Sequence, residues 1–328
     1  MSGEPRYTLA MPDGRRDFVK ALALAAAPDV PSARGRRYPF TQVDVFTDRP
    51  LEGNPLAVFT DARGLGDTEM QALARETNLS ETTFIVPRDA TEERKRGVQV
   101  RIWTPSGELP FAGHPSLGTA TVIRKLRGGT AVQIDLDLKI GKIPVTFESH
   151  PTGLFAEMRQ KDAEFGPAYK TDMIAPLIGL KREDIDPALP IQQISTGLHF
   201  IIVPLRSLQA IRSVRFNFPA ISEAFPGEPS RPLFLVTRET EDRRARLHQR
   251  LVLDGGEDPA TGSASGCVAA WMVRHSVARS GEQMLLEQGL EIHRSSRIYV
   301  RAERDGDRVL NVRVGGGVVQ VMQGEYSL

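Results

Sequence analysis

Two glycine-bearing turns constrain the fold of this chain more than any other feature of its 328 residues. The first reads FAGHPS at residues 111–116, and the second reads DPATGS at residues 258–263. Each turn follows a strand-like stretch and precedes an apolar segment of small residues that is typical of a buried helix. The strand-like stretches are 98–103 and 247–253, and the expected helices cover 117–123 and 264–271. The same strand–turn–helix unit is therefore expected twice, once in each half of the chain.

A glycine-bearing turn that leads into a helix predicts a binding site for a small anion. The first turn of a helix leaves several backbone N–H groups without partners inside the helix and carries partial positive charge. Glycine allows the backbone to approach a ligand where a Cβ atom would collide with it. Two such helix starts that face each other across a cleft would hold a small carboxylate.

Composition narrows the class of protein. The chain is long enough for two domains, and its 40% hydrophobic and 25% charged residues are typical of a soluble globular protein. A net charge of +1 gives no electrostatic reason to expect nucleic acid as a partner. The single cysteine, Cys267, excludes an internal disulfide. No apolar run approaches the roughly 20 residues of a membrane span, so no membrane contact is expected apart from the export machinery.

The N-terminal segment, residues 1–37, is predicted to be an export signal and linker. The sequence RRDFVK at residues 15–20 precedes a weakly apolar, alanine-rich stretch at 21–27, which is typical of a twin-arginine signal. We therefore expect a periplasmic or otherwise exported protein. The alternative is a cytoplasmic protein with a disordered tail, in which the alanine-rich stretch forms a stray helix.

Many short strands and few helices predict an α+β fold. The folded part is expected to begin near Tyr38, with one lobe over residues 38–150 and a second over residues 151–315. Three glycines at 315–317 are expected to precede a last strand, about 316–328, which is a candidate addition to the first lobe. Each lobe is predicted to be a barrel-like mixed sheet around its own helix, because a helix of small residues suits enclosure by a curved sheet.

Common cofactor signatures are missing from the sequence. No glycine-rich dinucleotide fingerprint follows a strand, no lysine-bearing phosphate loop occurs, and the six histidines show no metal-ligand spacing. The nucleophile elbow G-x-S-x-G is missing too. We therefore expect neither a cofactor nor a metal. The polar residues left at the turns are Glu81, His114, Asp258 and Ser263, and two carboxylates with an imidazole fit proton-transfer chemistry.

Three motifs occur in order along the chain: NLSET at 78–82, PFAGHP at 110–115 and DPATGSA at 258–264, and the turn GNP at 53–55 precedes them. Together they resemble the PhzF family, which comprises phenazine-biosynthesis isomerases and their relatives, and GNP resembles the family's early turn. The resemblance covers essentially all of residues 38–328. It implies the diaminopimelate epimerase fold, with two similar domains, an active site between them, usually a homodimer, and no organic or metal cofactor.

The resemblance also implies roles for individual residues. Glu81 resembles the family's catalytic acid/base, and His114 and Asp258 resemble residues that orient the substrate. Ser263, with neighbouring backbone N–H groups, would hold the substrate carboxylate. The substrate-binding residues expected at the two turns are Gly113, Ser116, Gly262 and Ser263.

The chemistry of a carboxyl group agrees with these implied roles. A single carboxyl that takes a proton from one carbon and returns it to another carbon of the same substrate performs an isomerisation. Burial in a dry cleft would raise the pKa of Glu81 toward the working pH. We therefore expect a cofactor-independent isomerase of a small carboxylate-bearing metabolite, with a biosynthetic role in which a phenazine precursor is one candidate substrate.

Two other functions stay open. An amino-acid epimerase or racemase on the same fold would use a thiol at each helix start, but these turns carry none. A non-catalytic, exported binding protein would keep only the anion site. Taken singly, Glu81 could pair with an arginine, whereas His114 and Asp258 could cap turns. Cys267 is expected to pack in the core, and Glu108 is expected in a solvated loop.

Overall fold

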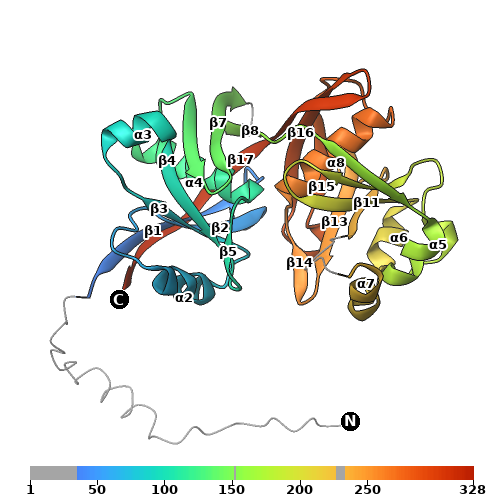
Figure 1. The fold of residues 1–328 in the computed structure, drawn as a ribbon, viewed down its shortest axis with the longest axis horizontal. Helices are drawn as coiled ribbons and strands as arrows, with labels where there is room; N and C mark the ends of the chain where they lie inside the picture. Colours follow the sequence, from blue (N-terminus) through green and yellow to red (C-terminus); the bar gives the residue numbers. More distant parts are fainter. Residues whose placement is uncertain (1–34, 151–152, 227–232) are drawn as a thin grey trace, which may run out of the picture. The chain divides into compact units, whose positions relative to one another are not determined.

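The computed structural model describes residues 35–150, 153–226 and 233–328. Residues Tyr38–Tyr326 form one compact unit (Figure 1). The predicted twin-arginine signal at residues 15–27 lies outside the described residues, so it stays a prediction. In the described part of the chain, no helix combines the length and the apolar character that crossing a bilayer requires.

Strands dominate the described part of this unit, where they join in one mixed sheet of 17 strands. The first eight strands along the chain are β1 (Arg37–Val45), β2 (Asn54–Phe59), β3 (Thr82–Val86), β4 (Val98–Trp103), β5 (Glu108–Leu109), β6 (Gln133–Leu138), β7 (Gly141–His150) and β8 (Gly153–Arg159). The remaining strands are β9 (Glu164–Tyr169), β10 (Ile191–Ser195), β11 (His199–Leu205), β12 (Leu233–Thr237), β13 (Ala245–Leu253), β14 (Gly256–Asp258), β15 (Met284–Gln288), β16 (Ser296–Asp305) and β17 (Arg308–Ser327).

The pairing pattern of the strands occurs twice along the chain. In the first series, β1–β2, β3–β4, β4–β5, β6–β7 and β7–β8 pair antiparallel, whereas β2–β3 and β4–β6 pair parallel. The second series repeats this order with β10–β11, β12–β13, β13–β14, β15–β16 and β16–β17 antiparallel, and with β11–β12 and β13–β15 parallel. The predicted mixed α+β class is confirmed, whereas the proposed lobe boundary near residue 150 stays a prediction.

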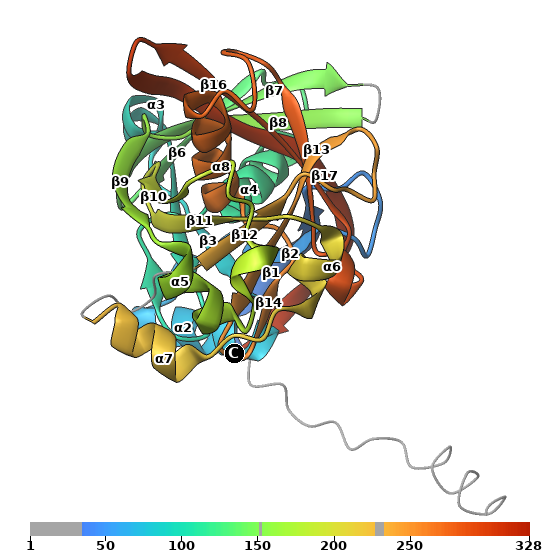
Figure 2. The same cartoon turned by 90° about the vertical axis from the view of Figure 1, so that its right-hand side faces the viewer.

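Two helices, α4 (Gly113–Leu126) and α8 (Gly262–Arg274), are almost wholly buried, one in each series. Helix α4 packs against β2, β3, β6, β7 and β8, and α8 packs against β10, β11 and β16 (Figures 1 and 2). Small side chains permit this enclosure, since a Cβ atom on Gly118 would lie 2.6 Å from Leu56. The helices on the outside are α2 (Asp67–Thr77), α3 (Ala90–Arg96), α5 (Thr171–Ile174), α6 (Leu208–Ser213) and α7 (Phe218–Ala224).

Both buried helices begin earlier than the sequence predicts. Helix α4 starts at Gly113 rather than at residue 117, and α8 starts at Gly262 rather than at residue 264. Proline is tolerated in the first turn of a helix because its missing N–H has no partner there in any case, so Pro115 does not delay α4. His114 and Ser263 therefore lie in first helical turns and not in preceding loops.

The last strand also differs from expectation. The glycines at 315–317 do not separate two strands, because β17 runs without a break through them. A Cβ atom on Gly315 would lie 2.6 Å from the carbonyl oxygen of Ala156, and one on Gly317 would lie 2.5 Å from the carbonyl oxygen of Thr47. These residues are glycine because neighbouring backbone passes too close for a side chain. They permit close packing instead of forming a turn.

Candidate active site

Glu81 and His114 are brought together by strand β3 and helix α4. Glu81 directly precedes β3. Alternate residues of an extended chain face the same side, so Glu81 is expected to share a face with Thr83. The hydroxyls of Thr83 and Thr119 lie 2.8 Å apart, which fixes β3 against the middle of α4. From this contact, Glu81 lies two residues back along the extended chain, which is about 6.6 Å, and His114 lies five residues back along the helix, which is about 7.5 Å. Because these two distances are similar, the two residues can lie together.

The two side chains face each other without forming a hydrogen bond. Glu81 Oε2 and His114 Nε2 lie 3.5 Å apart, and the side chains are 17% and 5% exposed. Within the described part of the chain, neither of these two buried atoms has a hydrogen-bond partner. Leaving a buried polar atom unsatisfied costs about 1–3 kcal/mol, so such pairs are rare and call for an explanation.

Asp258, the last residue of β14, supplies a second carboxylate shortly before α8. Asn54 Nδ2 donates to Asp258 Oδ1 at 2.7 Å, and Thr261 Oγ1 donates to Asp258 Oδ2 at 2.6 Å. Asn54 Nδ2 also donates to the carbonyl oxygen of Ala260 at 3.0 Å, while its Oδ1 is buried without a partner among the described residues. The negative charge of Asp258 reaches Glu81 and raises the pKa of that carboxyl.

Burial shifts the pKa values of all three groups. Loss of hydration, followed by the charge of Asp258, raises the pKa of Glu81 to about 8. Burial lowers the pKa of His114 to about 3. Burial raises the pKa of Asp258 to about 6, against the hydrogen bonds from Thr261 and Asn54 that lower it. Near pH 7, Glu81 therefore carries its proton, His114 is neutral, and Asp258 is ionised.

A buried glutamine holds the Asp258 turn in place. Gln288 Nε2 donates to the carbonyl oxygen of Asp258 at 2.8 Å and to Thr261 Oγ1 at 2.9 Å. Its Oε1 accepts from the backbone N–H of Thr261 at 3.0 Å and from Gln249 Nε2 at 3.1 Å. The sequence prediction missed both Gln288 and Asn54. The GNP turn could have pointed to Asn54, whereas a single glutamine at a strand end gives no signal.

The starts of the two buried helices touch each other. A Cβ atom on Gly113 would lie 3.0 Å from the backbone nitrogen of Ser263 and 3.2 Å from the carbonyl carbon of Gly262. Neither helix has a side-chain N-cap hydrogen bond, so neither uses a side chain to satisfy its first-turn N–H groups. The structure thus brings Gly113, Gly262 and Ser263 together. Ser116 differs, because its hydroxyl donates to the carbonyl oxygen of Ala112 at 2.7 Å inside its own helix.

Two further sequence expectations concern Cys267 and Glu108. Cys267 is fully buried in α8, as expected for core packing, and burial raises the pKa of its thiol to about 12. Glu108 does not lie in a solvated loop, because it belongs to β5 and its side chain is 8% exposed. Arg101 donates to both Glu108 carboxylate oxygens at 2.7 Å, which draws that side chain inward.

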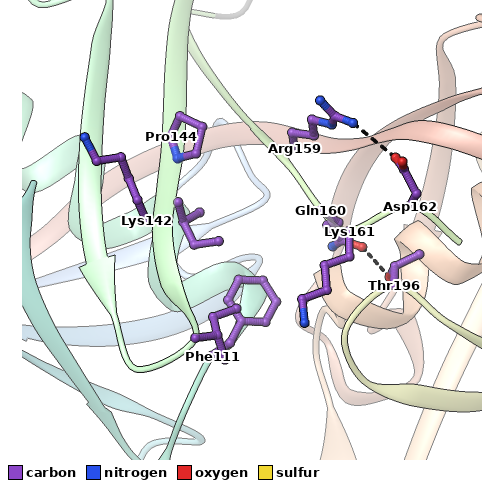
Figure 3. Close-up of a pocket in the computed structure, with 10 residues that line it drawn as sticks. Phe111, Lys142, Pro144, Arg159, Gln160, Lys161, Asp162 and Thr196 are labelled. Atoms are coloured by element: carbon purple, nitrogen blue, oxygen red, sulfur yellow. Dashed lines mark hydrogen bonds and ion pairs between the residues drawn. The ribbon is translucent and has the colours of Figure 1, made fainter. Parts of the chain in front are cut away.

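A pocket of about 450 Å³ lies next to the helix starts (Figure 3). Phe111, just ahead of α4, lines one wall, and Gln160 and Thr196 line the other. Gln160 Nε2 donates to the carbonyl oxygen of Gly262 at 2.9 Å, and Thr196 Oγ1 donates to Gln160 Oε1 at 2.6 Å. Across residues 35–150, 153–226 and 233–328, no three histidine, cysteine or carboxylate side chains are grouped to hold a metal ion.

Comparison with known proteins places this chain in a family. The model of the PhzC-PhzF family, described as phenazine biosynthesis-like protein, matches residues 43–324. An uncharacterized isomerase of Mesorhizobium japonicum is 34% identical over 296 residues, which is 87% of this chain and 97% of that protein. The trans-2,3-dihydro-3-hydroxyanthranilate isomerase of Pseudomonas aeruginosa is 33% identical over 293 residues, 88% of this chain and 99% of that protein.

A solved structure supports the same assignment. The crystal structure of a PhzF-family phenazine biosynthesis protein from Bacillus anthracis matches with a TM-score of 0.80 at 27% identity. The match covers 89% of this chain and 100% of that one. The chain therefore belongs to the PhzC-PhzF family of phenazine biosynthesis-like proteins, and it is a PhzF-like isomerase.

Proposed function

We propose that this isomerase moves a proton between two carbons of a small carboxylate-bearing substrate, with Glu81 as the acid/base. The observation that carries the proposal is the pair of buried, unpartnered atoms, Glu81 Oε2 and His114 Nε2, beside Asp258. A pKa of about 8 suits a group that must both give and take a proton near neutral pH. A purely structural ion pair would instead satisfy its buried atoms.

Glu81 alone can supply and take back the protons that such a reaction moves. The protonated carboxyl gives its proton to one carbon of a conjugated substrate, and the resulting carboxylate takes a proton from another carbon. The double bonds shift, the substrate keeps its composition because it gains one proton and loses another, and Glu81 regains its starting form. The opposite order, in which ionised Glu81 first removes a proton, gives the same product. The pKa of about 8 favours the order that begins with the protonated acid.

The neighbouring groups orient the substrate and stabilise its charge. Neutral His114 can accept a hydrogen bond from, or donate one to, a substrate group at the position of its unpartnered Nε2. Asp258, ionised and held by Asn54 and Thr261, can stabilise positive charge that develops on the substrate. First-turn N–H groups at Gly262 and Ser263 would bind the substrate carboxylate.

The substrate class follows from the named relatives. The Pseudomonas aeruginosa protein is named for trans-2,3-dihydro-3-hydroxyanthranilate, which is a small conjugated carboxylate. We take this compound as the first candidate substrate. The predicted export through the twin-arginine route and the predicted homodimer are part of the same proposal, and both need separate tests by fractionation and by sedimentation.

Replacing Glu81 with glutamine tests the acid/base role. Glu81→Gln keeps the size of the side chain but removes the transferable proton, so turnover should fall by at least about 10²-fold. Turnover is followed by absorbance and by NMR with trans-2,3-dihydro-3-hydroxyanthranilate in D₂O, and ligand affinity should change little. The exposed Glu76→Gln variant is the matched control. Full activity in Glu81→Gln would remove this residue from the mechanism.

The D₂O experiment also separates the competing functions. An isomerase shifts the double bonds, an epimerase inverts and labels one carbon, and a binding protein leaves the ligand intact. The two-thiol epimerase is disfavoured because the single cysteine of the chain is buried inside α8. If the wild-type protein leaves this compound unchanged, the substrate assignment is wrong.

A further inference from the structure

The pocket of about 450 Å³ beside the helix starts has a lining that the proposed proton transfer does not use. Glu81, His114 and Asp258 are not among its lining residues. Its volume lies within the range of about 300–1,000 Å³ that is common for small-molecule sites. Its apolar lining comes from Phe111, Ile140, Ile143 and Pro144.

The charged lining of this pocket is mostly positive. Among the described residues that line it, Lys142, Arg159 and Lys161 are basic, and Asp162 is the single acidic side chain (Figure 3). Asp162 is already engaged, because Arg159 lies 3.2 Å from it and the backbone N–H of Asn311 donates to it at 3.1 Å. Lys142 pairs with Asp135 at 3.2 Å, outside the pocket lining. This pattern leaves one cation of the pocket available for an outside anion.

Lys161 is that cation. Within the described part of the chain, no carboxylate lies within ion-pair distance of its ammonium group. Lysine is usually solvated, so an unpaired lysine alone means little. Here it lines a pocket whose other wall carries Phe111, and an aromatic ring with a nearby cation suits a flat apolar molecule with an anionic group.

Two side chains that line the pocket contact the backbone at the start of α8. Gln160 Nε2 donates to the carbonyl oxygen of Gly262 at 2.9 Å, and Thr196 Oγ1 lies 3.4 Å from the carbonyl oxygen of Ser263. Phe111 precedes Gly113 by two residues on the other side. A molecule in the pocket would therefore touch residues that position both helix starts.

We propose that this pocket binds the carboxylate or phosphate of a small aromatic molecule, with Lys161 paired to the anion and Phe111 packed on the ring. The molecule is either the distal end of an extended substrate or a separate ligand. The binding site does not depend on the acid/base role of Glu81, so either proposal can fail alone.

Calorimetry with the full chain tests the site, with benzoate and phenyl phosphate as probes and benzyl alcohol as the neutral comparison. Lys161→Glu should weaken binding of both anions by about tenfold or more, since an attractive charge becomes a repulsive one. Lys170→Glu, an exposed lysine outside the pocket, should bind like the wild type. Melting temperatures confirm that each variant is folded. The proposal is overturned if the wild type binds neither anion at about 10 mM, or if Lys161→Glu binds them equally well.

Inhibition kinetics distinguish the distal end of an extended substrate from a separate ligand. If the pocket holds the distal end of the substrate, phenyl phosphate competes with the substrate and raises its KM. If the pocket holds a separate ligand, phenyl phosphate changes kcat without competing. Either pattern must be lost in Lys161→Glu, and inhibition that survives this substitution contradicts the proposal. A Glu81→Gln variant that still binds phenyl phosphate separates this site from the catalytic one.

Discussion

Burial holds two side chains at this site, Glu81 and His114, in their uncharged forms near neutral pH. Glu81 keeps a proton up to about pH 8 because its charged form would lose hydration and face Asp258. His114 stays neutral for the same reason of lost hydration, with a pKa of about 3. Chemistry near neutral pH benefits from both states, but they lower the stability of the folded protein. Neither buried atom has a hydrogen-bond partner among the described residues, and Glu81 keeps a proton that it would release in the unfolded chain.

This cost predicts how stability depends on pH. In the unfolded chain Glu81 ionises near its ordinary value of 4.5, whereas in the folded chain it ionises near 8. Between these values the folded state binds more protons, so the contribution of Glu81 to stability falls as pH rises. His114 acts in the opposite direction, because its contribution is lost as pH falls from about 6.5 towards 3.

Glu81→Gln should therefore stabilise the protein at neutral pH. One pKa unit corresponds to about 1.4 kcal/mol, so the variant should gain about 3 kcal/mol of unfolding free energy at pH 7 and almost nothing at pH 4.5. Urea denaturation at both pH values measures this difference, with Glu76→Gln as control. A gain that is equal at the two pH values would show that the charge of Glu81 is not the cause.

The sequence identifies the candidate catalytic residues but not the residues that hold them in place. Glu81, His114 and Asp258 lie in motifs, so the amino-acid sequence alone is enough to name them. Gln288 cannot be named in this way, because it lies 30 residues beyond Asp258 and reaches it only through the parallel pairing of β13 with β15. Asn54 lies 204 residues before Asp258, and only the folded sheet brings their side chains together.

At the scale of elements, the contact between the starts of α4 and α8 organises the site. The sequence predicts both helices and the class of the fold, but it places the helix starts too late. Glycine and proline usually interrupt helices, and here they occupy first turns where backbone must approach backbone. The continuous path of β17 through three glycines has the same explanation. Local propensity alone cannot foresee a close approach between distant segments.

Gly113→Ala should damage activity more than stability. Alanine favours a helix over glycine by about 0.5–1 kcal/mol, which offsets part of the cost of pushing Ser263 away from a Cβ atom 3.0 Å distant. The two helix starts must separate by a few tenths of an ångström, so turnover should fall about tenfold. Gly107→Ala is the control, since a Cβ atom there meets nothing within 4 Å. Equal turnover in both variants would contradict this role of the contact.

At the scale of the whole unit, β17 links the two series of strands. Its first part pairs with β16, and its residues 313–317 also pair with β8. Its far end packs against the first series, where Tyr326 lies 5.1 Å from Phe40 and 5.4 Å from Phe59 between ring centroids (Figure 1). The pairing and the packing together join the C-terminal strand to the first strands of the unit.

Tyr326→Ala should lower the unfolding free energy by about 2 kcal/mol, because a partly buried aromatic ring loses its contacts with two others. Met322→Ala, a change at a side chain that is 48% exposed on the same strand, should lower it by less than about 0.5 kcal/mol. Urea denaturation measures both values. Similar losses in the two variants would mean that the end of β17 adds no specific packing.

The most direct test of the whole account is the titration of the Glu81 carboxyl itself, which needs no substrate. Carbon-13 NMR of protein labelled in glutamate side chains, with Glu81→Gln to identify the signal, gives its midpoint. We predict ionisation near pH 8 and a lower midpoint in Asp258→Asn, where the neighbouring negative charge is gone. A midpoint near 4.5 in the wild type, unchanged in Asp258→Asn, would contradict a buried proton carrier at this position.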